Sequence, residues 1–238
     1  MINKNYIAHI IYLSLLIAFI PKELDFEFCF AFLLVHVILF LFLNDESLHY
    51  LTYFNIGILL FIVNYLYFQS ISFTIALIFY AIIFSKSFWS KLIQITFGFI
   101  LTLLTLIQVN YLKEFDANFW YFFCDKSINL ISLTTQNYYL IPFILILIFS
   151  IIDTYQNSNK QSFLKKYENN KFIIILSFGF LSLFLVNDLT FNYLLMLIFP
   201  ISVYISRLIN YQKKKYFQEI IFLILILSLI LFKLKVLL

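Results

Sequence analysis

Three carboxylates stand close together directly after the first apolar run of the chain. Residues 21–27 read PKELDFE and contain Glu23, Asp25 and Glu27. Carboxylates are side chains that bind divalent cations and that serve as general bases in proteins. This segment is therefore the most chemically suggestive part of the sequence.

The two acids of Glu23-Leu24-Asp25 resemble a feature of polytopic glycosyltransferases that use polyprenyl-linked sugars. Those enzymes carry an acidic residue, or a Glu-x-Asp pair, in the first outer loop. The resemblance implies that Glu23 and Asp25 would bind a metal ion or act as the base. The loop here, residues 21–25, is shorter than in that class. The alternative is a negatively charged outer loop that follows the charge bias of membrane topology.

Two histidines, His9 and His36, fall inside apolar runs. An ionisable residue within the membrane is a functional candidate, although a neutral histidine can also hydrogen-bond a neighbouring helix. No acid stands at helical spacing from either histidine, so the sequence predicts no metal site and no cofactor. Cys29 and Cys124 form no Cys-x-x-Cys motif and are expected to be small buried apolar residues.

The composition indicates which elements must position these residues. Of 238 residues, 63% are hydrophobic and 12% are charged, and the mean hydropathy is +0.98. A soluble domain has about a quarter charged residues, so an ordinary globular enzyme and a disordered chain are excluded. The sequence predicts an all-α protein, a polytopic bundle of transmembrane helices that forms a single integral membrane domain over 1–238.

Nine apolar runs stand between the clusters of charged residues. A helix needs about 20 apolar residues to cross the hydrocarbon core, and backbone satisfaction in lipid requires each run to be helical. The third and fourth runs are separated by two residues, so one fused helix and eight spans are the alternative. The predicted spans lie near 6–20, 26–43, 51–68, 71–84, 93–112, 139–152, 172–186, 191–205 and 216–232.

Basic residues are unequally divided between the two sides of the predicted bundle. The side that holds the N-terminus carries eleven of them, and the opposite side carries five. Because cytoplasmic loops hold the excess of Lys and Arg, we expect a cytoplasmic N-terminus and a C-terminus outside. The eleven are Lys4, Lys86, Lys91, Lys160, Lys165, Lys166, Lys171, Arg207, Lys213, Lys214 and Lys215.

Two segments are typical of a membrane interface. Residues 114–126, EFDANFWYFFCDK, place Trp120 and Tyr121 between acids, which suits an interfacial helix on the outer face; a substrate-binding role is the alternative. Residues 211–219, YQKKKYFQE, form a basic patch. Its lysines, Lys213, Lys214 and Lys215, can contact anionic headgroups, or they serve topology alone. The expected partners are the lipid bilayer and other membrane subunits, and not nucleic acid.

Several short motifs resemble a known family. They are Asn187-Asp188, Phe199-Pro200, Ile209-Asn210-Tyr211, the lysine run, Phe217-Gln218-Glu219-Ile220 and, within residues 53–68, Phe54, Gly57 and Tyr67-Phe68. With these motifs the chain is similar to an uncharacterised family of multi-pass inner-membrane proteins from Bacteroidota bacteria, over at most half of its length. The resemblance implies a bacterial inner membrane and no assigned activity; an organellar inner membrane is the alternative.

Three functions are consistent with the sequence. The favoured one is a non-enzymatic subunit or scaffold of a cell-envelope membrane complex, since glycine-rich nucleotide loops and catalytic clusters are missing. The first alternative is a lipid-linked-sugar glycosyltransferase that uses Asp25 and Glu23. The second is a transporter of a small molecule or lipid. It requires polar residues from several spans to converge at the midplane, namely His9, His36, Asn55 and Asn64.

Overall fold

The computed structural model describes residues 4–20, 26–43, 51–67, 70–84, 87–112, 135–157, 170–177, 179, 192–212 and 214–237. These residues form helices joined by turns, and none of them lies in a β-strand. The prediction of an all-α protein is thus confirmed for the described part of the chain. The chain forms two compact units, one from residues 1–23, 132–176 and 190–238 and the other from 24–131 and 177–189. The single integral membrane domain expected from the sequence stays a prediction.

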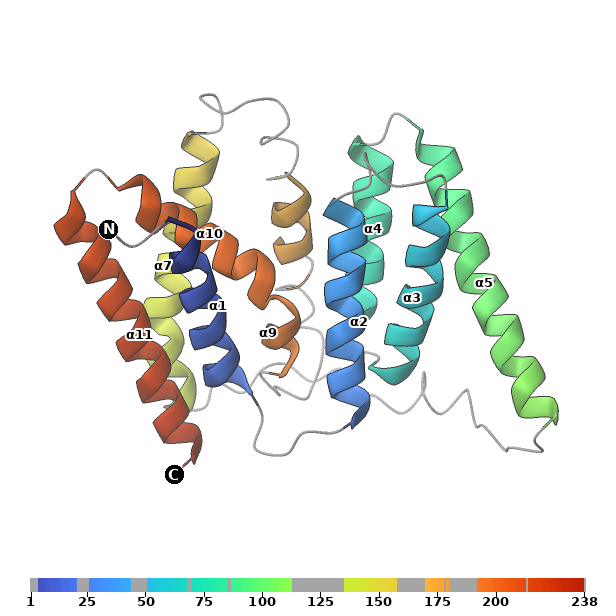
Figure 1. Cartoon of the computed structure of the whole chain (residues 1–238), viewed down its shortest axis with the longest axis horizontal. Helices are drawn as coiled ribbons and strands as arrows, with labels where there is room; N and C mark the ends of the chain where they lie inside the picture. The colour runs from blue at the N-terminus through green and yellow to red at the C-terminus, as the bar shows by residue number, and fades with distance from the viewer. Residues whose placement is uncertain are drawn as a thin grey trace. The chain divides into compact units, whose positions relative to one another are not determined.

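The first unit is built around helix α10 (Figure 1). Helix α10 contacts α1, α7, α9 and α11, and most of its side chains are buried. Phe19 joins the outer helices, because its ring centroid lies 5.8 Å from that of Phe143 and 5.6 Å from that of Phe232. The elements of this unit are α1 (Lys4–Phe19), η2 (Thr135–Leu140), α7 (Ile141–Gln156), a helical segment at 170–177, α9 (Asn192–Met196), α10 (Ile198–Tyr211) and α11 (Lys215–Leu237).

A proline separates α9 from α10. Pro200 has no backbone N–H, so the carbonyl of Met196 receives no hydrogen bond from it. The helix is interrupted between Met196 and Ile198, and the amide of Leu197 instead reaches back only three residues, to the Leu194 carbonyl at 3.0 Å. The predicted span at 191–205 is therefore two helices around a break rather than one continuous helix.

The second unit contains α2 (Phe26–Leu43), α3 (Thr52–Leu66), α4 (Ile71–Phe84) and α5 (Phe88–Leu112), and α3 contacts the other three (Figure 1). Helix α2 is apolar on all sides, yet only one side of it is covered by protein. The buried stripe recurs at helical spacing and consists of Phe28, Ala31, Val35, Ile38, Leu39 and Phe42. The exposed apolar residues of α2 are Phe26, Phe30, Leu33, Val37 and Phe40.

Helices α3 and α5 run parallel and in close contact. Residue contacts between them keep a constant offset along the chain, from Tyr53 with Lys91 to Phe61 with Phe99. Two glycines permit the approach. A Cβ atom at Gly57 would overlap the carbonyl oxygen of Ile95, and one at Gly98 would overlap a carbonyl of α3. Small residues at helix interfaces are a usual device of membrane helix packing, because they bring backbones together.

Within the described residues, four helices are long and apolar enough to cross a membrane. They are Phe26–Leu43, Trp89–Val109, Tyr138–Gln156 and Lys215–Lys235, and two shorter apolar helices are Tyr6–Phe19 and Thr52–Leu66. The large exposed side chains on these helices are mostly apolar, which is the surface that hydrocarbon requires. The protein is therefore an integral membrane protein.

Candidate functional site

The acidic pair and the aromatic segment singled out from the sequence, Glu23 with Asp25 and Trp120 with Tyr121, lie outside the described residues, as does Lys213. Lys214 and Lys215 are exposed at the turn from α10 to α11. Glu27 is exposed in the first turn of α2. The structure thus places two of the five predicted interface residues, and both are at the surface.

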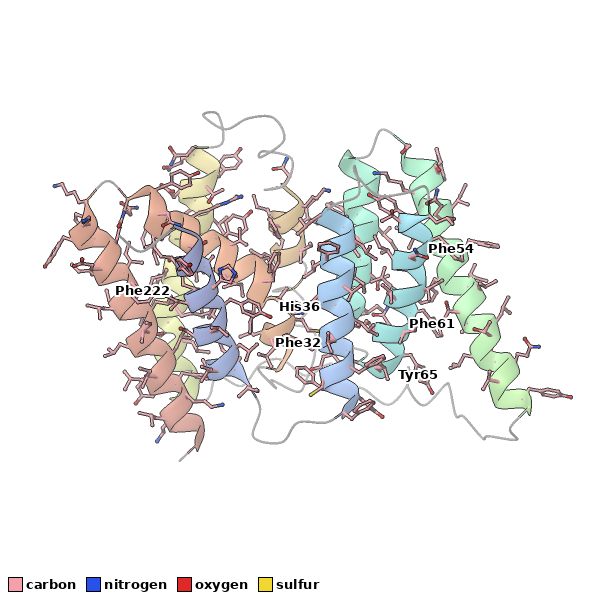
Figure 2. The ribbon with its side chains drawn as sticks, in the orientation of Figure 1. Phe32, His36, Phe54, Phe61, Tyr65 and Phe222 are labelled. Atoms are coloured by element: carbon pink, nitrogen blue, oxygen red, sulfur yellow. The ribbon has the colours of Figure 1, made fainter. Side chains whose placement is uncertain are left out.

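The two intramembrane histidines have different surroundings. His9 is exposed on α1, whereas His36 is half-buried on α2. The Nδ1 atom of His36 lies 2.9 Å from the carbonyl oxygen of Phe32, and the two rings are 4.3 Å apart. Figure 2 shows this pair one turn apart on the same helix. The contact of His36 with its own helix backbone is a way of satisfying a polar ring in an apolar setting.

The two asparagines of α3 do not converge. Asn55 is exposed, while Asn64 is part-buried and faces α4. The Asn64 amide donates to the Thr74 hydroxyl at 2.7 Å, and the Ser70 hydroxyl lies 2.7 Å from the Asn64 amide oxygen. This cluster joins the end of α3 to the start of α4. In the second unit, the polar residues that a transporter would need are thus not gathered in one place.

Metal-binding side chains are also dispersed. Within the described ranges, no group of three or more His, Cys, Asp or Glu residues is placed to hold a metal ion. Cys29 is half-buried on α2, as expected for a small apolar residue, and Cys124 lies outside the described ranges.

Lys233 contacts the last described residue before the first predicted outer loop. Lys233, near the end of α11, donates from Nζ to the carbonyl oxygen of Ile20 at 2.6 Å. Ile20 comes directly after α1 and three residues before Glu23. The two residues are 213 positions apart in the chain, so no local sequence signal could have indicated this contact.

Helix α10 carries a polar region inside the first unit. Tyr204 is fully buried, and its hydroxyl is within electrostatic range of Arg207, one turn further along. The ring of Phe172 lies 6.4 Å from that of Tyr204 and 5.9 Å from that of Phe199. Lys171, next to Phe172, is only 1% exposed. Lys171 and Arg207 are two of the eleven basic residues expected on the cytoplasmic side, and the structure buries the first and half-buries the second.

This arrangement gives the first unit a buried basic character near α10. Buried cations are costly unless they are paired or hydrogen-bonded, so within the membrane they are functional candidates. Arg207 and the polar side chains around it are therefore the strongest candidates for a binding site among the described residues.

The comparison with known proteins bears on the whole chain. Residues 1–238 match a model described as a family of unknown function, DUF6427. The chain belongs to this family. DUF6427 membership confirms the resemblance to an uncharacterised family and extends it from half of the chain to all of it. No curated protein and no solved structure matches the chain. The function of this DUF6427 member must therefore be argued from its own contacts.

Proposed function

We propose that this DUF6427 protein is a non-enzymatic subunit or scaffold of a cell-envelope complex in a bacterial inner membrane. It forms one membrane domain of nine spans, with a cytoplasmic N-terminus and a C-terminus outside. The described helices are those of an integral membrane protein. Beyond that, we propose the span count, the orientation, the type of membrane and the role in a complex.

The parallel packing of α3 and α5 supports nine spans rather than eight. Two parallel neighbours require the chain to return between them, and α4 is the helix that lies between them in the sequence. The Asn64–Thr74 hydrogen bond holds α3 and α4 at a turn, so the two are separate helices. A single fused helix over 51–84 would leave no element for the return.

The exposure of α5 carries the proposal of a subunit. Only 11% of the crossing segment Trp89–Val109 is buried, against 33% for Phe26–Leu43. Because α5 is long and packs on protein along one side only, most of its surface is available to another membrane helix. Several polar side chains inside the described helices bind partners within the protein, as Asn64 does with Thr74, which favours a structural role for them over a chemical one.

A photo-crosslinking amino acid at Leu104, which is exposed on α5, tests the proposal. The protein is expressed in its native membrane, irradiated and purified, and crosslinked chains are identified by mass spectrometry. We expect one membrane protein to be captured in stoichiometric amount. A matched control at Leu60, which is fully buried on α3, should capture none. Capture of lipid alone at Leu104 would contradict the proposal.

The Lys233 contact favours the glycosyltransferase as a second candidate. It brings an ammonium group to the start of the loop that contains Glu23 and Asp25. Ile20 precedes Glu23 and Asp25 by three and five residues in the sequence, and an ammonium group is suited to bind the phosphate of a lipid-linked sugar. No observation of this kind favours the transporter.

The glycosyltransferase candidate is tested by transfer from a polyprenyl-phosphate sugar donor in vesicles that contain the purified protein. Asp25→Asn should abolish transfer, and Lys233→Gln should reduce it. Lys235→Gln, which alters an exposed lysine in the last turn of the same helix, serves as the control. Full transfer by Asp25→Asn would sink this candidate.

A further inference from the structure

Arg207 is chemically distinct from every other basic residue of the chain. The protein has 16 Lys and Arg residues, and all but Arg207 are lysine. The guanidinium group is planar and offers a rigid fork of donors that matches phosphate and carboxylate oxygens, whereas a lysine ammonium acts as a point charge. Position 207 is therefore the one at which this chain can offer a planar, two-point donor to phosphate or carboxylate oxygens.

The Arg207 guanidinium group has unused donors. Its Nη1 atom is buried and makes no hydrogen bond to the described residues. The neighbouring hydroxyls make other bonds and none to Nη1: Ser202 donates to the carbonyl of Phe199 at 2.8 Å and Ser206 to that of Val203 at 2.9 Å. An unsatisfied donor on a charged group is expensive to bury, so the geometry favours an acceptor other than the described residues.

The described carboxylates of the first unit are not that acceptor. The Asp153 carboxylate on α7 accepts a hydrogen bond from the side-chain amide of Asn157, with Nδ2 and Oδ1 3.1 Å apart. Glu219 is exposed on α11. Neither of these two acids is joined to Arg207 by an ion pair in the described structure. Arg207 itself is half-buried, so part of its side chain stays accessible although Nη1 is buried.

The end of α10 has the character of a headgroup region. Tyr211, Lys214 and Lys215 are exposed there, and Tyr216 follows with 70% of its surface exposed. Exposed tyrosines beside lysines are typical of the level of lipid headgroups. The turn is held in place, because the Gln218 amide donates to the carbonyl of Gln212 at 2.7 Å. Arg207 lies one turn below this level, where long basic side chains extend toward the interface.

We propose that Arg207 binds the phosphate of an anionic phospholipid headgroup, with Lys214 and Lys215 supplying further positive charge. Charge-assisted, two-point hydrogen bonds to phosphate are the interaction for which arginine is best suited. When the Arg207 side chain extends toward the interface, the headgroup supplies the acceptor that Nη1 lacks, and the acyl chains lie along the apolar surface. Free phosphate shares the headgroup's chemistry but has no acyl chains, so the two ligands can be separated by experiment.

The test uses the full-length protein in nanodiscs of phosphatidylcholine alone or of phosphatidylcholine mixed equally with phosphatidylglycerol. Thermal unfolding and native mass spectrometry are measured for the unchanged protein and for Arg207→Met. We expect phosphatidylglycerol to stabilise the unchanged protein. Arg207→Met should lose this gain and retain about fivefold less phosphatidylglycerol, the effect of removing one basic residue near an anionic surface.

The phosphatidylcholine discs distinguish a binding role from a structural one. There, Arg207→Met should be at least as stable as the unchanged protein, because an apolar side chain replaces a buried group with an unsatisfied donor. A loss of stability that is equal in both lipids would mean a structural role and would overturn the proposal. So would an undiminished gain from phosphatidylglycerol in Arg207→Met.

Three controls complete the experiment. Lys235→Met removes an exposed basic residue at the other end of α11 and should leave phosphatidylglycerol binding unchanged. Lys214→Gln with Lys215→Gln should weaken binding and leave the protein folded, because both side chains are exposed. Inorganic phosphate added to the phosphatidylcholine discs should not reproduce the stabilisation. Equal stabilisation by inorganic phosphate would overturn the lipid as the ligand.

Discussion

At the scale of the residue, polar side chains inside the apolar helices bind one another or the nearest backbone. The Lys91 amine lies 2.9 Å from the Tyr53 hydroxyl and 4.5 Å from the centre of its ring. Asn64 binds Thr74, and His36 lies against the carbonyl of Phe32. Hydrocarbon offers no hydrogen-bond partner, so each polar group must find one in the protein. Among the described residues, this rule leaves four buried polar atoms without a partner, and Arg207 Nη1 is the charged one; the others are Gln94 Oε1 and the hydroxyl oxygens of Ser150 and Ser228.

The asparagines of α3 provide a test of this rule. Asn64→Leu should lower the free energy of unfolding by about 0.6 to 1.7 kcal/mol, the range measured for hydrogen bonds between membrane helices. Asn55→Leu changes the same residue type on the exposed side of the same helix and should be neutral or stabilising, since it places an apolar group against lipid. Thermal unfolding in one detergent compares the two. Equal effects of the two substitutions would contradict the role given to Asn64.

At the scale of the element, the α3–α5 pair shows how the second unit is held together. Both helices are apolar on most sides, so the hydrophobic effect does not select one face over another within the membrane. Close backbone approach at Gly57 and Gly98 selects the face, and the rings of Phe61 and Phe99 pack edge to face beside it at 5.0 Å. Shape, and not hydrophobicity, sets this contact.

Gly57→Ala measures the value of this close approach. Alanine favours a helix over glycine by up to about 1 kcal/mol, but its Cβ would overlap the carbonyl of Ile95, which belongs to a backbone that cannot move freely. Overpacking of this kind costs about 1 to 3 kcal/mol, so we expect a net loss of stability. Thr96→Ala, at an exposed position of α5, is the control and should change the melting temperature little. An increase in stability for Gly57→Ala would show that the helices separate easily.

At the scale of the whole molecule, the membrane explains the surface. Exposed leucine, isoleucine and phenylalanine side chains cover the outer sides of the long helices, for example Leu104 on α5 and Leu223 on α11. A water-soluble protein rarely exposes apolar patches of such extent, whereas a bilayer requires them. The exposed lysines of the described chain stand near helix ends, as Lys214, Lys215 and Lys235 do, where basic residues commonly bias membrane orientation.

Reporter fusions test the proposed orientation. Alkaline phosphatase fused after Leu238 should be active, because the enzyme matures only outside the cytoplasm, where its disulfides can form. The same reporter fused after Gln212, on the predicted cytoplasmic side, should be inactive. A fluorescent protein that matures in the cytoplasm should give the opposite pattern. Both termini on one side would mean an even number of spans and would contradict nine.

Local hydropathy predicted the helices well and their contacts poorly. The bounds of α2 and α4 agree with the predicted spans at 26–43 and 71–84, because charges or polar residues end both runs. The break at Leu197 is a local effect of Pro200, because this residue lacks the N–H that would donate to the carbonyl one turn earlier in the same helix. The Lys233–Ile20 contact, in contrast, joins distant parts of the chain. The pattern of apolar residues does not indicate which residues of two distant helices lie at the same level.

The sequence by itself determined the membrane location, the helical class and the expected orientation, because these follow from transfer free energies that are summed along the chain. Membership of an uncharacterised family was also visible in its motifs. Only the tertiary structure decided that α3 and α5 pack through two glycines, that α10 lies at the centre of its unit, and that Arg207 keeps a buried donor with no acceptor among the described residues. The physical reason is that in lipid nearly every helix face is apolar, so close packing and hydrogen bonding choose the partners.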